Sequence, residues 1–141
     1  MTEIYLRGLE RFLTPILLVL TLFMLYRGHD LPGGGFIAGL IAAAAFELRI
    51  LSRGPERVRK ELGKFLQPGI GIGLLLAICT AIGGIFAGGF FQGIWVEFDI
   101  GNAHLKFGTP QLFDVGVFLT VASVATSYLL GMSEAAYDTS D

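Results

Sequence analysis

The stretch RGHDLPGGGFIAGL, residues 27–40, separates two long apolar segments of the chain. Pro32 cannot continue a helix, because its ring clashes with the preceding turn and its nitrogen carries no hydrogen. The three glycines that follow it permit positive φ angles, so the stretch predicts a turn between two helices. A phosphate-binding loop is excluded, because no lysine follows the glycines and no strand precedes them. The fold is therefore predicted outward from this turn.

The composition identifies the surroundings of the helices. The chain has 141 residues, of which 53% are hydrophobic and only 16% are charged, and its mean hydropathy is +0.67. Soluble domains carry about 25% charged residues, so lipid is the expected solvent. The net charge of −2 predicts no broad basic surface for nucleic acid. The single cysteine, Cys79, excludes a disulfide framework and a cysteine-based metal site, and no cofactor motif is present.

Four apolar segments predict four transmembrane helices in a single domain that spans residues 1–141. Crossing the bilayer core of about 30 Å takes about 20 helical residues. The predicted helices cover residues 6–27, 33–51, 66–87 and 110–132. The charged residues 52–65 are expected to form a loop, and the final EAAYDTSD is expected to form a short mobile tail.

A different pattern separates the third and fourth segments. Trp95, Glu97 and Asp99 alternate with apolar residues, and Gly101-Asn102 marks a turn before a second short run. Such alternation around a turn is typical of a β-hairpin. The predicted fold class is therefore an all-α membrane protein with four transmembrane helices and a small outer-side β-hairpin between helices 3 and 4.

The distribution of basic residues predicts the orientation in the cell membrane. With four spans, both termini lie on one side, which holds eight of the ten Lys and Arg residues, whereas Arg27 and Lys106 lie on the other. Because cytoplasmic segments carry the excess of Lys and Arg, both termini of this multi-pass protein are expected in the cytoplasm.

The second segment carries a stripe of small residues. Gly35, Gly39, Ala43 and Glu47 recur every four residues and share one helix face, and small residues at this spacing let membrane helices approach closely. Glu47 is therefore expected to point toward a neighbouring helix. Arg49 lies about 200° around the helix from Glu47, so each is expected to find its partner elsewhere.

The fourth segment predicts helix contacts on two sides. Asp114 lies nearly opposite a stripe of small, weakly polar residues. This stripe consists of Gly116, Thr120, Ser123, Ser127 and Gly131. One acidic face and one small face on the same helix indicate a piece that is packed inside a larger assembly.

Ionisable groups at membrane depth are the candidates for contact with ions or protons. The ion-path candidates are Asp114, Glu47 and His29, and histidine titrates near neutral pH. Each has a structural alternative, because an acid suits the start of a helix, Glu47 can anchor at the interface, and a loop histidine can be merely solvated. No nucleophile, base or metal-ligand set is present, so no catalytic and no metal-binding residue is assigned. The predicted turn and helix-packing residues are Pro32, Gly33, Gly34, Gly35, Phe36 and Gly39.

Two motifs carry a resemblance to a known family. HDLPGGGFIAGL, residues 29–40, and TPQLFDVGVFLTV, residues 109–121, resemble the MnhB-type subunit of the Mrp-type (Mnh-type) multisubunit sodium/proton antiporters. The resemblance covers nearly the whole chain, and Ala38 departs from the glycine expected there. It implies a non-catalytic subunit that packs against other antiporter membrane subunits in the lipid bilayer, in a complex that transports Na⁺ and H⁺. Because the same subunit type also occurs in energy-converting membrane-bound hydrogenases, that setting and a purely structural scaffold remain alternatives.

Overall fold

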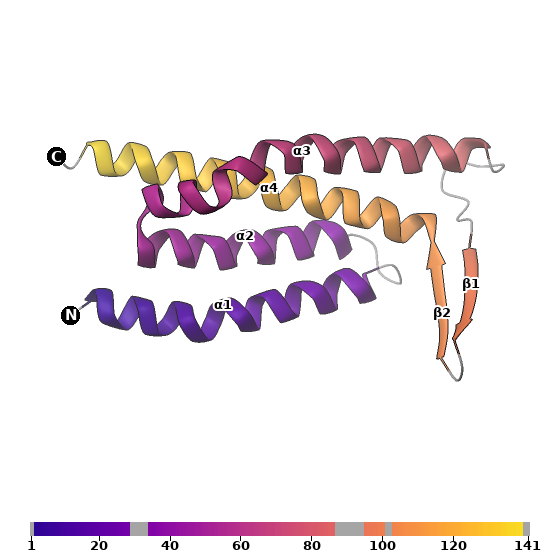
Figure 1. Cartoon of the computed structure of the whole chain (residues 1–141), viewed down its shortest axis with the longest axis horizontal. Helices are drawn as coiled ribbons and strands as arrows, with labels where there is room; N and C mark the ends of the chain where they lie inside the picture. The colour runs from indigo at the N-terminus through magenta and orange to yellow at the C-terminus, as the bar shows by residue number, and fades with distance from the viewer. Residues whose placement is uncertain (1, 29–33, 87–94, 101–102, 140–141) are drawn as a thin grey trace.

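The computed structural model describes residues 2–28, 34–86, 95–100 and 103–139. Four helices dominate it: α1 (Thr2–Arg27), α2 (Gly34–Arg53), α3 (Pro55–Phe86) and α4 (Thr109–Asp138). Each helix is long and apolar enough to cross a membrane. The helices lie side by side, and the two termini lie at the same end as the α2–α3 connection (Figure 1). An even number of spans places both termini on one side of the membrane.

The connection between α2 and α3 corrects the predicted loop at 52–65. Only Gly54 interrupts the helices; its φ is +86°, and its N–H donates to the carbonyl oxygen of Ile50 at 2.9 Å. A glycine in the left-handed region commonly ends a helix. α3 then starts at once, with Arg57 and Glu61 one turn apart. The loop prediction was wrong because charged residues are unfavourable in hydrocarbon but remain good helix formers outside it.

Two further helix ends differ from the prediction. α1 begins at Thr2 instead of residue 6, and α4 continues to Asp138 instead of ending at residue 132. The expected mobile tail is therefore helical as far as Asp138. α3 has 32 residues and a length of about 48 Å, which exceeds the bilayer core. Pro68 lies inside α3, and Figure 1 shows the helix bending in its first half.

Two short strands connect α3 and α4. β1 (Trp95–Ile100) pairs antiparallel with β2 (Ala103–Gly108) at the end of the molecule opposite the termini (Figure 1). The packed core and all four candidate spans are nevertheless helical among the described residues. The fold class is therefore an all-α four-helix fold, and the prediction that counted a β-hairpin as part of that class is corrected. The predicted turn at Gly101-Asn102 lies outside the described residues.

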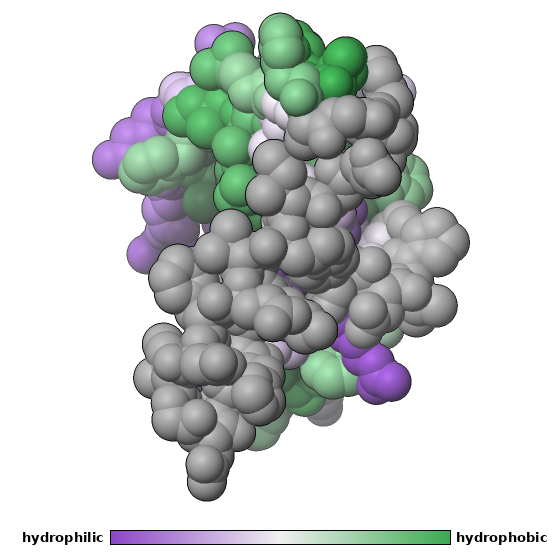
Figure 2. Space-filling view, turned by 90° about the vertical axis from the view of Figure 1, so that its right-hand side faces the viewer, coloured by the Kyte–Doolittle hydropathy of each residue, from purple (hydrophilic) through white to green (hydrophobic). Residues whose placement is uncertain are grey.

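The buried core is small and lies toward the end with the termini. Ile50 of α2, Val58 and Leu66 of α3 and Leu130 of α4 form one hydrophobic cluster. Large apolar side chains instead cover the outside of the helices, as the end-on view in Figure 2 shows. Exposed apolar surface of this extent marks contact with lipid or with other proteins. The arrangement identifies a multi-pass membrane protein.

α3 and α4 approach each other through glycines. A Cβ atom added at Gly116 would lie 2.7 Å from the backbone nitrogen of Ala77, and one added at Gly73 would lie 2.6 Å from Thr120 Oγ1. Neither position accepts a side chain without moving a helix. The predicted small stripe of α4 therefore faces α3 at Gly116 and Thr120. Its last member, Gly131, is exposed, and a Cβ there would meet open space.

The α3–α4 contact generates a stability prediction. Gly116→Val is expected to destabilise the protein by about 1–3 kcal/mol, because overpacking forces the two helices apart. Gly131→Val on the same helix is the matched control and should leave stability nearly unchanged. Thermal unfolding in detergent measures both, and equal losses in the two variants would contradict the proposed close contact.

Candidate functional site

The first candidate region is the contact between α2 and α4. A Cβ atom added at Gly35 would lie 2.3 Å from the carbonyl oxygen of Asp114, and one added at Gly39 would lie 2.8 Å from Val121 Cβ. The backbones of the two helices therefore meet at the level of Asp114. This contact places the start of α4, with its half-buried acid, directly against the start of α2.

Glu47 lies three turns further along α2. Its side chain is half-buried, and its Oε2 atom is covered and accepts no hydrogen bond from the described residues. A covered carboxylate oxygen without a donor loses the solvation that water would give it. Along the helix, Glu47 lies about 18 Å from Gly35, so Glu47 and Asp114 occupy different depths of the same helix pair.

Arg49 finds its partners on other helices, as predicted. Its Nη2 donates to Glu61 Oε2 of α3 at 3.2 Å, and its Nε lies 3.9 Å from Glu10 Oε1 of α1. The prediction that Arg49 does not pair within α2 is therefore confirmed. One arginine thus connects three helices near the end with the termini.

Glu10 is the acidic residue at the centre of this charged group. It is only 5% exposed, and both of its oxygens face Arg53 of α2. Arg53 Nη2 lies 3.0 Å from Glu10 Oε1, and Nε and Nη2 donate to Oε2 at 3.4 and 3.3 Å. The planar guanidinium suits such two-point recognition of a carboxylate. The pair fastens α1 to α2.

Glu10 was not among the residues predicted from the sequence. A signal was present, because Arg49 and Arg53 lie one turn apart near the end of α2 and both require an acid. In two antiparallel helices, the start of α1 lies beside the end of α2. The charges that precede the first apolar run were therefore the place to look for that acid.

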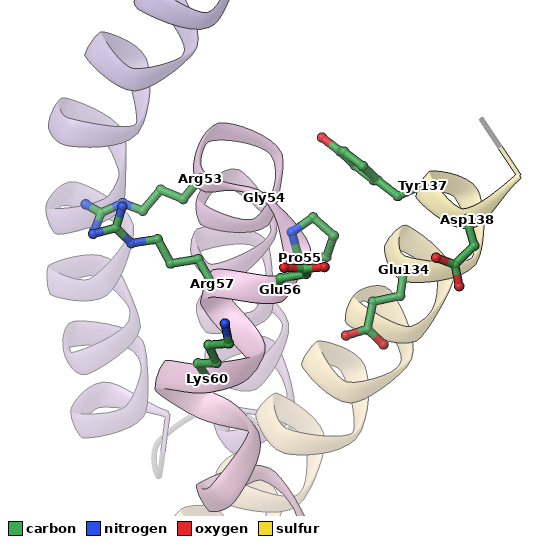
Figure 3. A pocket seen from close by; sticks show the side chains of 9 residues that line it. All are labelled: Arg53, Gly54, Pro55, Glu56, Arg57, Lys60, Glu134, Tyr137 and Asp138. Carbon is green, nitrogen blue, oxygen red and sulfur yellow. The ribbon is translucent and has the colours of Figure 1, made fainter. Parts of the chain in front are cut away.

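A second ion pair closes the same end of the molecule between α3 and α4. Arg59 Nη2 donates to Glu134 Oε2 at 2.7 Å, and Arg59 Nε donates to Glu134 Oε1. Glu134 also lines an open cavity of about 730 Å³ with Arg53, Arg57 and Tyr137 (Figure 3). This end of the helix bundle therefore carries its ionic contacts.

The predicted turn residues are only partly placed. His29, Pro32 and Gly33 lie outside the described residues. Gly34 approaches Gly28 so closely that an added Cβ would lie 2.2 Å from the Gly28 Cα, and this contact joins α1 to α2 at the end opposite Glu10. Phe36 is 50% exposed on the surface of α2.

Fold and charge placement define the class of protein. Four membrane-spanning helices surround no cluster of three His, Cys, Asp or Glu side chains that could hold a metal ion, within the part of the chain that the structure describes. Their outer surface is apolar, and their ion pairs gather at one end. The class is that of a small multi-pass membrane protein with partly buried carboxylates.

Comparison with known proteins gives the family. Residues 5–127 match the family described as a domain related to the MnhB subunit of Na⁺/H⁺ antiporter, so the chain belongs to this family. It is 32% identical over 136 residues to a Na⁺/H⁺ antiporter subunit of Alkalihalophilus pseudofirmus, in a match that covers 94% of this chain and 93% of that protein. It is also 32% identical to "Putative antiporter subunit mnhB2" of Staphylococcus aureus strain Newman, with 93% and 94% coverage.

A solved structure resembles the fold as a whole. A chain in the structure of the Mrp complex from Dietzia sp. DQ12-45-1b superposes with a TM-score of 0.75 at 29% identity. The match covers 94% of the present chain but only 14% of that longer chain. The four-helix protein described above thus resembles one part of a much larger polypeptide.

The buried and exposed acids around Arg49 generate a second stability prediction. Glu10→Gln is expected to cost about 1–3 kcal/mol, because the covered site loses a charged partner for two arginines. Glu61→Gln removes the exposed partner and should cost about 0–1 kcal/mol. Thermal unfolding in the same detergent compares the two, and a larger loss for Glu61→Gln would show that the assignment of the central acid is wrong.

Proposed function

We propose that this chain is a non-catalytic membrane subunit of a multisubunit Na⁺/H⁺ antiporter, where it packs against neighbouring subunits and contributes to an ion path. The observation that carries the proposal is the nearly full-length correspondence with a Na⁺/H⁺ antiporter subunit. The names of the relatives describe transporter subunits rather than an enzyme, and they favour the antiporter setting over the hydrogenase setting. The exposed apolar surface supports contact with other membrane subunits.

Glu47 and Asp114 are the proposed points of contact with the transported ions. Both are half-buried acids on the two helices that approach through Gly35 and Gly39. Ionisable groups inside membrane helices commonly mark ion and proton pathways. Their separation of about 18 Å along the helix is too long for one proton transfer, so they would serve different depths of the path.

Neutralising these acids tests the ion-path role. Glu47→Gln in the assembled complex is expected to shift the pH dependence of antiport and to lower its rate severalfold, and Asp114→Asn is expected to lower the rate. Glu56→Gln, an exposed acid in the first turn of α3, is the control. The measurement is Na⁺-driven pH change in membrane vesicles, together with the subunit content of the purified complex.

The same assay separates this role from that of a structural scaffold. A scaffold predicts that Gly39→Leu disrupts assembly, because a Cβ there already meets Val121, while both neutralised carboxylates leave antiport normal. Normal assembly with an unchanged pH profile in Glu47→Gln would remove Glu47 from the ion path, and normal antiport in Asp114→Asn would remove Asp114.

The proposed orientation places both termini in the cytoplasm. Its support is the excess of Lys and Arg at the end of the molecule that holds the termini. In a Cys79→Ala background, Arg27→Cys should react with a membrane-impermeant thiol reagent applied to intact cells, whereas Asp138→Cys should react only after the cells are opened. The reverse pattern of labelling would invert the topology.

A further inference from the structure

A groove lined by arginines lies at the end of the bundle that holds the termini. It has a volume of about 350 Å³ and runs between α1 and the α2–α3 connection. Its lining residues are Arg7, Glu10, Arg11, Arg53 and Arg57. Four guanidinium groups and one carboxylate give it a formal excess of three positive charges.

The single acid of the groove is already engaged. Glu10 is buried against Arg53, with Arg49 beside it. Arg7 and Arg11 lie one turn apart on α1, and neither forms an ion pair with any described residue. The guanidinium groups of Arg53 and Arg57 lie next to each other and point toward α1 (Figure 3). Like charges this close repel one another unless an anion lies among them.

The groove lies at the depth of lipid headgroups. Arg7 and Arg11 occur in the first turns of the candidate span Ile4–Arg27, about 30 Å and 24 Å along the helix from Arg27. Arginines near the end of a membrane helix reach the interface between hydrocarbon and water. An anion bound here would therefore meet the protein at the membrane surface.

An apolar hollow adjoins the arginines on the same turns of α1. It has a volume of about 570 Å³. Its lining residues are Ile4, Tyr5, Leu6, Gly8, Leu9 and Phe12. The side chains of Ile4 and Phe12 are 76% and 75% exposed, so this surface is open to a hydrocarbon chain. A cationic cradle beside an apolar hollow fits a molecule that has both a charged and an apolar part.

We propose that the groove binds the phosphate of an anionic phospholipid, with Arg7 and Arg11 on the phosphate and an acyl chain along the apolar hollow. Basic pockets between membrane helices on the cytoplasmic side commonly hold such headgroups. A free phosphate shares the charge chemistry but has no group for the hollow. The binding is independent of the antiport function, because it uses neither Glu47 nor Asp114.

Thermal stabilisation of the purified, delipidated full chain by short-chain phosphatidylglycerol tests the proposal. The wild-type protein should show a saturable rise in its unfolding midpoint, and phosphatidylcholine should produce none. Arg7→Gln/Arg11→Gln should weaken the apparent affinity by about thirtyfold, because each basic residue near an anionic headgroup contributes about a factor of five. Lys60→Gln/Lys64→Gln removes the same charge from the same end of the molecule outside the groove and should retain the response.

The source of the anion is distinguished by two further probes. Inorganic phosphate and glycerophosphoglycerol, the headgroup without acyl chains, should bind far more weakly than the complete lipid if the apolar hollow contributes. Equal binding of these probes would overturn the lipid assignment in favour of a free phosphate site. Equal loss in the Arg and Lys variants would overturn it in favour of general charge attraction.

Two additional measurements cover a folding defect and a protein contact. Arg57→Gln changes a lining residue whose side chain is 71% exposed, so a reduced lipid response in this variant supports the groove even where the double arginine variant fails to fold. In the assembled complex, loss of neighbouring subunits from Arg7→Gln/Arg11→Gln without any change in bound phosphatidylglycerol would assign the groove to a protein contact and overturn the proposal.

Discussion

The close approach of helix backbones is the constraint on which the rest of this structure depends. Lipid tails are as apolar as leucine, so no hydrophobic force drives membrane helices together, and they associate by dense packing. Here α4 meets α2 where Gly35 lies against Asp114, and it meets α3 where Gly116 lies against Ala77. Both contacts tolerate no side chain. α4 can therefore stand between two helices, and the acid at its start is fixed relative to α2 by backbone geometry instead of by a side-chain pair.

α1 joins this arrangement by a different means. It is fastened to α2 at both ends, through the contact of Gly28 with Gly34 at one end and through Glu10 with Arg53 at the other. Breaking a buried pair costs far more than breaking an exposed one, because a covered charge is left without compensation. The ion pairs gather at the end where the helices leave the hydrocarbon. The same end carries the excess of basic residues that sets orientation, so packing and topology depend on the same set of charges.

Periodicity and composition predict the four helices, the small faces of α2 and α4, and the separation of Arg49 from Glu47, because these follow from local spacing along one helix. The start of α3 at Pro55 escapes such reasoning, since the charges that exclude residues from lipid do not exclude them from a helix. Glu10 escapes it for another reason. Its burial depends on Arg53, 43 residues away, and only the antiparallel packing of α1 and α2 brings the two together.

A comparison of two carboxylates shows which of them is suited to handle protons. Glu10 is held by Arg53, with Arg49 beside it, so its negative charge is compensated within the chain and it serves as a fastening. Glu47 has a covered oxygen that no described residue supplies with a donor. An acid without internal compensation keeps its charge only by meeting a cation, a proton or a group of a neighbouring subunit. Asp114 already makes an interaction within the protein, so Glu47 is the stronger candidate for exchange with the exterior of this chain.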